Sequence, residues 1–243
     1  MDLKELTKKI QRHVGVKADG IYGPNTAQAI LNKLGVDELS EVALKLSQVH
    51  ETMARAIAHM EDHAVTGPEN LRIVRLPASD KGGDWEICGV SDGFEPKEVG
   101  DMKAYMDAGD NQSAWNYLLT YLIKNTDPVL SYANVSLYPA LEFFLRDMYF
   151  NMGPGGCVKV IQRVCRAKGA DIKYDGAIGP ATRKAFAEVI ESRGSDKELL
   201  DSFHQHREDY YKGLNQFKEF GKGWLNRNDE AYDYALQFLQ FLK

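Results

Sequence analysis

The stretch VKADGIYGPNTAQAI, residues 16–30, returns far downstream as IKYDGAIGPATRKAF, residues 172–186. Both copies follow the same tripeptide, Ile-Gln-Arg, at residues 10–12 and 161–163, although the spacer is longer in the second copy. An internal repeat of this kind indicates one structural unit that the chain uses twice. The match has no gap, and six of its identical residues are the turn and helix-start residues: Asp19, Gly20, Gly23, Pro24, Thr26 and Ala29 match Asp175, Gly176, Gly179, Pro180, Thr182 and Ala185.

The repeated residues predict a helix, a tight turn and a second helix. Asp-Gly favours a tight bend, and the second glycine of the pattern permits a positive φ. Pro24 and Pro180 suit the first turn of the following helix, because proline lacks the N–H that a helix start leaves unpaired. We therefore predict one helical hairpin at residues 2–34 and another in the C-terminal half.

Composition excludes several classes of protein. The chain has 243 residues, enough for a sizeable core, and its 44% hydrophobic and 27% charged residues are typical of a soluble globular protein. The net charge of −5 and the lack of a basic tract argue against nucleic acid as a partner. No stretch has the apolar length of a transmembrane helix, so we expect no membrane insertion.

The N-terminus and the cysteines bear on the compartment. MDLKELTKKIQRHV is amphipathic and lacks the uninterrupted apolar run of a secretory signal, so we expect synthesis in the cytoplasm without a signal peptide. Cys88, Cys157 and Cys165 are an odd number without metal-ligand spacing. They predict buried thiols in a reducing compartment, with a single disulfide as the alternative.

Hydrophobic periodicity predicts a mostly α fold with one small β-hairpin. A three- or four-residue apolar repeat predicts a long helix from about residue 38 to residue 63. Residues 71–78 and 84–90 have strand-like patterns on either side of the turn SDKGG. Helical patterns then resume. They cover residues 111–125, 136–150, 196–214 and 228–243.

Glu61 is the candidate general acid. It stands at the end of the long predicted helix, four residues after Ile57, and borders the apolar face. Burial raises the pKa of a carboxyl group and keeps it protonated near neutral pH, as cleavage of a glycosidic bond requires. An acid at a helix C-terminus also opposes the helix dipole by about 0.3–1 kcal/mol, which indicates a purpose other than helix stability. A solvated acid at the helix end is the alternative.

Two resemblances follow from these residues. The pattern Gln, then Asp-Gly-x-x-Gly-Pro-x-Thr-x-x-Ala, resembles the peptidoglycan-binding repeat of bacterial and phage cell-wall enzymes. A helix-terminal Glu, then Asp-Lys-Gly-Gly at 80–83 and Gly-Val-Ser at 89–91, resembles glycoside hydrolase family 108, which contains phage lysozyme-like endolysins and secretion-associated muramidases. FNMGPGGCVKVIQRV, YDGAIGPATRKAF and GKGWLNR resemble the C-terminal half of that family.

The chain departs from the family pattern around the acid. Asp62-His63 follow Glu61 where the family has Gly-Gly-Tyr, and the interval to Asp80 is longer than usual. Glu69 is therefore the main rival for the acid and Glu86 a weaker one. We favour Glu61, because the family's acid ends a helix, whereas Glu69 follows a Gly-Pro that predicts a loop.

The resemblance also implies partners for the acid. Asp80 is the candidate second carboxylate, although an Asp before Lys-Gly-Gly is also an ordinary turn former. Candidate substrate contacts follow at Gly82, Gly83 and Trp85; Trp85 could stack on a sugar ring or pack in the core. The candidate wall-binding residues of the first repeat are Asp19, Gly20, Tyr22 and Gly23.

A zinc site is a minor alternative. His59 and His63 are four residues apart, a spacing that can bind zinc on one helix face. Glu61, however, is two positions after His59, about 200° around the helix, whereas the zincin glutamate directly follows its first histidine. We expect no metal and no cofactor, and a zinc-dependent amidase or peptidase remains the alternative chemistry.

These observations predict a two-part peptidoglycan hydrolase. Residues 1–36 would form a helical wall-binding module and residues 37–243 a lysozyme-like muramidase, with a catalytic part at 37–150 and a helical part at 151–243 that holds the second repeat. We expect a monomeric N-acetylmuramidase that acts on bacterial peptidoglycan in the periplasm or cell wall after release, with the module as a tether. A non-catalytic wall-binding protein of a virion or secretion system is the alternative.

Overall fold

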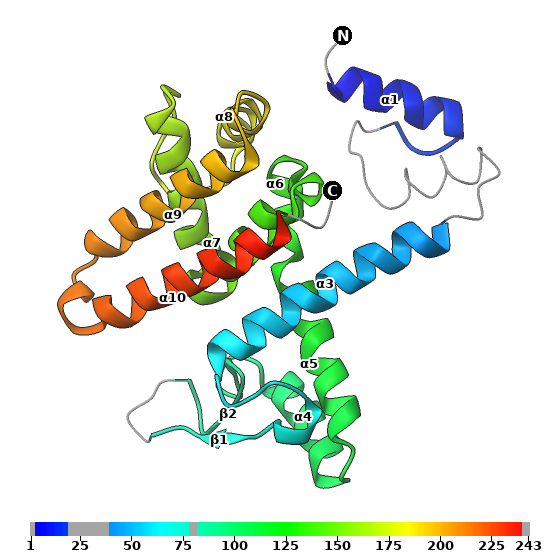
Figure 1. Cartoon of the computed structure of the whole chain (residues 1–243), viewed down its shortest axis with the longest axis vertical. Helices are drawn as coiled ribbons and strands as arrows, with labels where there is room; N and C mark the ends of the chain where they lie inside the picture. Colours follow the sequence, from blue (N-terminus) through cyan, green and yellow to red (C-terminus); the bar gives the residue numbers. More distant parts are fainter. Residues whose placement is uncertain (1–2, 19–38, 78–81, 240–243) are drawn as a thin grey trace. The chain divides into compact units, whose positions relative to one another are not determined.

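The structure is a computed structural model that describes residues 3–18, 39–77 and 82–239 (Figure 1). The chain divides into two compact units, Met1–His50 and Glu51–Lys243. The predicted domain boundary after residue 36 lies outside the described residues and stays a prediction. No helix in the described ranges combines the length and the apolar character needed to cross a bilayer.

The first unit contains the first half of the N-terminal repeat. Helix α1 spans Leu3–Val14, as the amphipathic pattern predicts. It ends at Gly15, whose φ of 81° allows the backbone N–H of Val16 to reach back to the carbonyl of Gln11 at 3.0 Å. The candidate wall-binding residues lie outside the described residues: Asp19, Gly20, Tyr22 and Gly23.

Helix α3, Leu39–Glu61, begins in the first unit and ends in the second. The prediction of a long helix here is confirmed, and in the second unit Met53, Ile57 and Met60 form its buried face. Asp62 closes the following turn by accepting a hydrogen bond from the backbone N–H of Ala64 at 3.0 Å. The helix therefore ends where the acidic pair stands, which leaves Glu61 in its last position.

A small antiparallel sheet follows, with strands β1 (Val74–Arg75), β2 (Trp85–Ile87) and β3 (Val90–Ser91) in that order. The predicted hairpin is present, but residues 84–90 are not one strand. A turn at Cys88 and Gly89, with φ values of 45° and 77°, divides them and adds the third strand. The reversal brings the backbone of Gly89 close to the end of α3.

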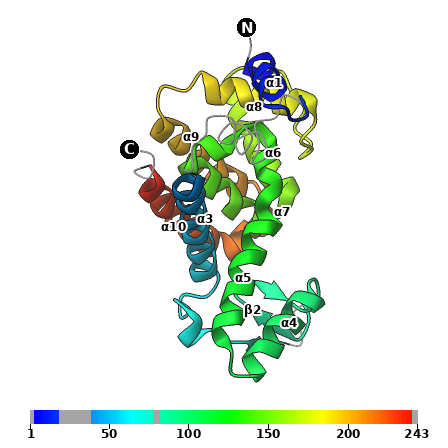
Figure 2. The ribbon, with the colours of Figure 1, turned by 90° about the vertical axis from the view of Figure 1, so that its right-hand side faces the viewer.

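Helices make up most of the second unit, and the predicted mostly α fold with one small sheet is confirmed. Figures 1 and 2 both place the sheet, α4 and α5 at one end of this unit and α8 and α9 at the other. Helices α7, α9 and α10 pack against one another. The bounds are η1 Pro68–Asn70, α4 Pro96–Asp107, α5 Asn111–Thr126, η2 Asp127–Val129, α6 Leu130–Ala133, η3 Val135–Leu137, α7 Pro139–Ala167, α8 Pro180–Glu191, α9 Asp196–Lys212 and α10 Phe217–Phe238.

Two helices differ from their sequence patterns. Helix α7 changes direction at Gly153, whose φ of 71° and ψ of 169° are not helical, directly before Pro154. Helix α10 begins at Phe217, well before the predicted residue 228, and takes in GKGWLNR. Gly221 lies inside the helix without breaking it, and glycine is required there, because the position is buried and a Cβ would lie 2.7 Å from the Phe217 ring.

The second repeat forms a helical hairpin from the end of α7, a loop at residues 168–179 and α8. Gln162 is fully buried and connects the parts. Its Nε2 donates to Asp175 Oδ1 at 2.9 Å and the carbonyl of Ala177 at 3.2 Å, and its Oε1 accepts from the N–H of Gly176 at 2.9 Å. Thr182 Oγ1 lies 3.3 Å from the same Nε2. The Gln, Asp-Gly and Thr of the repeat are therefore one hydrogen-bond network.

Replacing the buried glutamine tests this network. We expect Gln162→Ala to lower the free energy of unfolding by about 2–4 kcal/mol, because buried backbone and side-chain groups lose their partner. Urea unfolding followed by circular dichroism measures the loss. Gln205→Ala removes the same side chain from an exposed position on α9 and should change stability by less than about 0.5 kcal/mol. Equal losses in the two variants would contradict the assignment.

Candidate active site

Glu61 stands at the C-terminal end of α3 with its side chain only 17% exposed. Burial raises the pKa of its carboxyl group above the ordinary value, and the charges of Asp147 and Glu86 act in the same direction. Arg227 opposes them, but the net direction is upward. Glu61 therefore keeps its proton to a higher pH than an exposed glutamate does.

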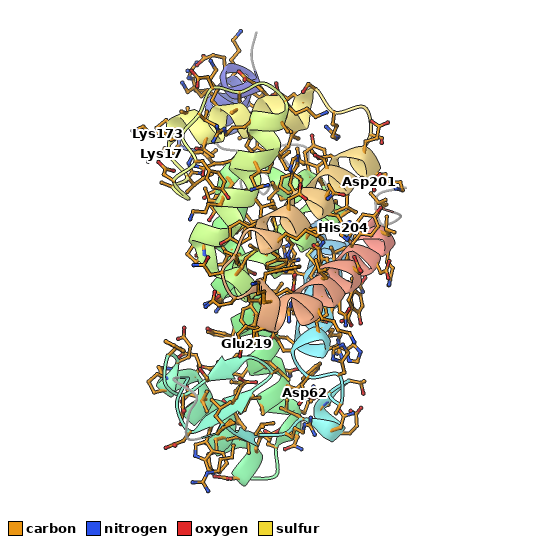
Figure 3. All side chains as sticks on the ribbon, turned by 90° about the vertical axis from the view of Figure 1, so that its left-hand side faces the viewer. Lys17, Asp62, Lys173, Asp201, His204 and Glu219 are labelled. Atoms are coloured by element: carbon orange, nitrogen blue, oxygen red, sulfur yellow. The ribbon has the colours of Figure 1, made fainter. Side chains whose placement is uncertain are left out.

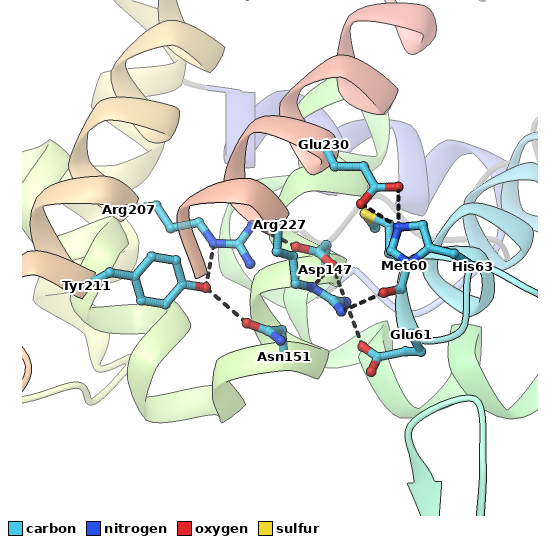
Figure 4. A network of polar contacts seen from close by, with 9 residues as sticks. All are labelled: Met60, Glu61, His63, Asp147, Asn151, Arg207, Tyr211, Arg227 and Glu230. Atoms are coloured by element: carbon cyan, nitrogen blue, oxygen red, sulfur yellow. Dashed lines mark hydrogen bonds and ion pairs between the residues drawn. The ribbon is translucent and has the colours of Figure 1, made fainter. Parts of the chain in front are cut away.

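Arg227, on α10, joins the end of α3 to the core (Figure 4). Its Nη2 lies 2.6 Å from Glu61 Oε1 and 2.7 Å from Asp147 Oδ1. Its Nη1 donates to the carbonyl of Met60 at 3.3 Å, near the end of α3 where helix carbonyls lack intrahelical partners. One guanidinium group thus holds two carboxylates and the last turn of a helix.

Asp147, on α7, is fully buried between two arginines. Burial alone would raise the pKa of this carboxyl group, but Arg227 and Arg207 hold it below the ordinary value. Arg207 Nη1 lies 2.6 Å from Asp147 Oδ2, and its Nε donates to the hydroxyl of Tyr211 at 3.0 Å. That hydroxyl in turn donates to Asn151 Oδ1 at 2.9 Å. Asp147 stays ionised, whereas the environment of Glu61 favours the protonated acid.

Gly89 covers the carboxyl group of Glu61 from the sheet. A Cβ at Gly89 would lie 2.8 Å from Glu61 Cδ and Oε2, and its φ of 77° is unfavourable for other residues. The neighbouring Cys88 is buried, and burial together with nearby carboxylates raises the pKa of its thiol to about 12. This thiol is therefore no nucleophile near neutral pH.

The other predicted carboxylates occupy different surroundings. Asp80 lies outside the described residues. Glu69 stands in η1 with an exposed side chain, whereas Glu86 is half-buried on β2 and close enough to raise the pKa of Glu61. Of the two rivals, the structure brings Glu86 and not Glu69 into the electrostatic surroundings of Glu61.

Gly82 and Gly83 lie against Asp92 and Gly93, which gives both glycines a structural role. The carbonyl of Gly82 accepts a hydrogen bond from the N–H of Gly93 at 2.8 Å. A Cβ at Gly83 would lie 2.1 Å from Asp92 Oδ1, and its φ is 108°. Trp85 is 36% exposed, with the guanidinium carbon of Arg75 5.9 Å from the ring centre. Contact of these three predicted residues with sugar stays a prediction.

The two histidines of HMEDH face separate partners. His59 Nδ1 lies 3.2 Å from the carbonyl oxygen of Val65, and His63 Nε2 lies 3.0 Å from Glu230 on α10. Within the part of the chain that the structure describes, no group of three or more His, Cys, Asp or Glu side chains could hold a metal ion. The three cysteines are free and buried, as their spacing predicts.

Sequence reasoning missed the network behind Glu61. Arg227 is the last residue of the GKGWLNR motif, but the motif does not show which residues it contacts. No motif in the sequence points to Asp147 or Arg207. The available signal was weak: Asp147 stands in the otherwise largely apolar run LEFFLRDMYF at residues 141–150, where a charged residue needs a buried partner.

Comparison with known families bears on the C-terminal half of the second unit. Residues 156–229 match the family model described as "Predicted Peptidoglycan domain". This segment includes the second repeat, Arg207 and Arg227, whereas Glu61 and Asp147 precede it. The match supports peptidoglycan as a partner. No curated protein and no solved structure matches the chain.

The two carboxylates make Arg227 essential to stability. We expect Arg227→Met to lower the free energy of unfolding by about 3 kcal/mol or more near pH 7, because Asp147 then keeps only one of its two arginines and Glu61 loses its ion pair. The folded-state pKa of Asp147 is lowered, so its ion pairs contribute above the ordinary carboxyl pKa and fade as pH falls through the folded-state pKa. The loss should therefore shrink in acid.

Urea unfolding at about pH 7 and about pH 3 measures both effects. Lys222→Met, at an exposed position of the same helix, is the control and should be nearly neutral. A loss that is the same at both pH values would contradict the ionic account of the network.

Gly89 and Gly109 form a matched pair for testing the turn over Glu61. Both have a similar positive φ, but a Cβ at Gly109 meets nothing within 4 Å. We expect Gly109→Ala to cost about 1 kcal/mol from backbone strain and Gly89→Ala about 2–4 kcal/mol, because it also clashes with the carboxyl group. In a Glu61→Ala background the excess should largely disappear, as urea unfolding would show. An unchanged excess would place the clash elsewhere.

Proposed function

We propose that this chain is a peptidoglycan hydrolase, an N-acetylmuramidase of the lysozyme type with Glu61 as its general acid. The observation that carries the proposal is the mostly buried carboxyl group at the end of α3, whose pKa is raised by burial. It lies in the same compact unit as the segment that matches a peptidoglycan domain. The resemblance to family 108 endolysins supplies the substrate and the bond.

Glu61 and Arg227 have different roles in the proton transfer: Glu61 is the proton donor, and Arg227 stabilises the carboxylate that remains. Protonated Glu61 donates to the glycosidic oxygen as the bond to the departing sugar breaks, which leaves a carboxylate in a partly buried site. Arg227 Nη2, 2.6 Å away, stabilises that carboxylate, and Asp147 holds the guanidinium from its other side. Arg227 is therefore a positioning residue that lowers the cost of losing the proton, while burial keeps the net shift of the Glu61 pKa upward.

A second carboxylate or a positioned water completes the hydrolysis on the other face of the sugar. Asp147 is unsuited to that role, because it is fully buried and paired with two arginines. Asp80 stays our proposal, with Glu86 on β2 as the rival among the described residues. Gly82, Gly83 and Trp85 would contact the glycan beside them.

The polymer determines where the protein acts. We place its action in the periplasm or cell wall, where peptidoglycan is found, and we propose that it works as a monomer. The N-terminal repeat would tether the enzyme to the insoluble polymer and raise the local concentration of substrate.

Peptidoglycan binding without hydrolysis is the second candidate function. The 2.6 Å ion pair between Arg227 and Glu61 favours the carboxylate, which cannot donate a proton. The matched family segment also begins only at residue 156 and so does not include Glu61. In this alternative, Glu61 only anchors the end of α3 to α10.

Mass spectrometry of muropeptides released from isolated sacculi separates the candidates. We expect the wild type to release fragments with reducing-end N-acetylmuramic acid and Glu61→Gln to lower the rate about 10²–10⁴-fold, because the proton donor is lost. Glu69→Gln is the matched control and should keep the wild-type rate. The wild-type rate should fall as pH rises through the raised pKa of Glu61, since only the protonated acid is active.

The other outcomes are equally informative. Loss only in Glu69→Gln would move the acid to η1. Wild-type protein that co-sediments with sacculi but releases no muropeptide would favour the binding protein. Product from Glu61→Gln at the wild-type rate would remove Glu61 from the mechanism.

A further inference from the structure

A hollow in the unit Glu51–Lys243 lies away from Glu61. The end of α7, the loop at residues 168–179 and α9 border an open, shallow pocket of about 270 Å³. Lys173, the neighbour of Tyr174 in this loop, is labelled in Figure 3. The whole pocket falls within the segment that matches the peptidoglycan domain. Its lining residues are Arg163, Arg166, Tyr174, His206 and Asp209.

Two guanidinium groups in this pocket lack an acidic partner. Arg163 and Arg166 stand one turn apart on α7, and within the described residues neither forms an ion pair with a carboxylate. Arg163 Nε is buried without a hydrogen-bond partner. By contrast, two fully buried arginines of this unit, Arg146 and Arg207, form ion pairs with Glu142 and Asp147. An unpaired buried donor in a folded protein calls for a ligand or a water.

The remaining lining residues leave the pocket positive. Burial, together with the charge of Arg163, lowers the pKa of His206, so this imidazole is neutral near pH 7 although Asp209 acts against the shift. Asp209 faces His206 Nδ1 at 4.0 Å and accepts a hydrogen bond from Gln205 Nε2 at 3.1 Å. Two arginines against one aspartate give a net charge of +1 for the five lining residues.

Tyr174 supplies an apolar wall to the same pocket. Its side chain is 38% exposed, and Lys159 Nζ lies 5.9 Å from the ring centre, which adds a further cation beside it. The first repeat has no equivalent, because Gly15 and Ala18 stand where the second repeat has Arg166 and Tyr174. Arg163 is matched by Arg12, but the other two repeat residues that line the pocket, Arg166 and Tyr174, are particular to the C-terminal copy.

We propose that this pocket binds a carboxylate of the peptide stem of peptidoglycan, with the guanidinium groups of Arg163 and Arg166 as its donors. Planar guanidinium groups bind carboxylates through paired charge-assisted hydrogen bonds. The volume is below the roughly 300–1,000 Å³ of pockets for drug-sized ligands, so it suits a single terminal residue with its carboxylate near the arginines and its aliphatic part on Tyr174. The inference rests on the proposed association with peptidoglycan and does not require hydrolysis.

A binding experiment in the Glu61→Gln background isolates this pocket from catalysis. The probe is sacculi freed of phosphate-containing polymers, either untreated or with their peptide carboxylates converted to amides. We expect Arg163→Gln/Arg166→Gln to bind untreated sacculi about tenfold more weakly or worse, because two charge-assisted contacts are lost. Arg166→Gln alone, at an exposed position, should lose part of the affinity without affecting folding.

The matched control removes two positive charges from the same region. Lys168→Gln/Lys184→Gln changes two exposed lysines and should alter binding less than about twofold, since isolated surface charges contribute little. Amidation should weaken the parent protein about as much as the double arginine variant does, and it should not weaken that variant further, because both changes remove the same interaction.

Several results would overturn the inference. They are equal losses in the arginine and lysine variants, additive losses from amidation and substitution, or unchanged binding by Arg163→Gln/Arg166→Gln. If the parent protein binds no sacculi at all, the association with peptidoglycan fails as well. If wild-type protein hydrolyses sacculi while the arginine variants bind normally, only this pocket is wrong and the proposed enzyme stands.

Discussion

The guanidinium group of Arg227 holds the second unit together around the candidate site. It lies between Glu61 at the end of α3 and Asp147 on α7, at 2.6 and 2.7 Å, and also donates to the carbonyl of Met60. A buried charge is stable only with an opposite charge and hydrogen bonds, so α10 must dock where these partners meet. The position of Glu61 is a consequence of that docking and of the turn at Gly89 that packs on its carboxyl group.

The same cluster shifts the pKa values of two carboxyl groups in opposite directions. Asp147 has two arginines and stays ionised, whereas Glu61 shares one arginine, is desolvated and experiences the charges of Asp147 and Glu86. Pairs of acids whose surroundings separate their pKa values are typical of acid–base sites. The same residues also form an ion-pair network. Glu61 would therefore act as a protonated acid in hydrolysis, but as a carboxylate paired with Arg227 if it only anchors α3 to α10.

The repeat shows how one sequence pattern can serve structure and binding at once. Gln162, Asp175, Gly176 and Thr182 are occupied with one another, so the repeated residues of this copy form the hairpin and are not free for a ligand. Residues that differ between the copies, Arg166 and Tyr174, line the positive pocket instead. In this copy Gln162, Asp175, Gly176 and Thr182 build the scaffold, whereas the lining of the pocket combines the shared Arg163 with the variable Arg166 and Tyr174.

Local periodicity and turn chemistry were enough to predict α1, α3, the helical hairpin of the second repeat, the mostly α fold and a glutamate at a helix end, because each depends on neighbours within a few residues. The third strand, the early start of α10 at Phe217 and the roles of Asp147 and Arg207 could not be predicted in this way. They depend on contacts between residues far apart in the chain, such as Gly89 with Glu61 or Arg227 with Asp147. The sequence by itself determined which acid ends the helix; only tertiary packing decided that this acid is buried, paired with an arginine and inclined to keep its proton, because desolvation and charge depend on what surrounds a group in space.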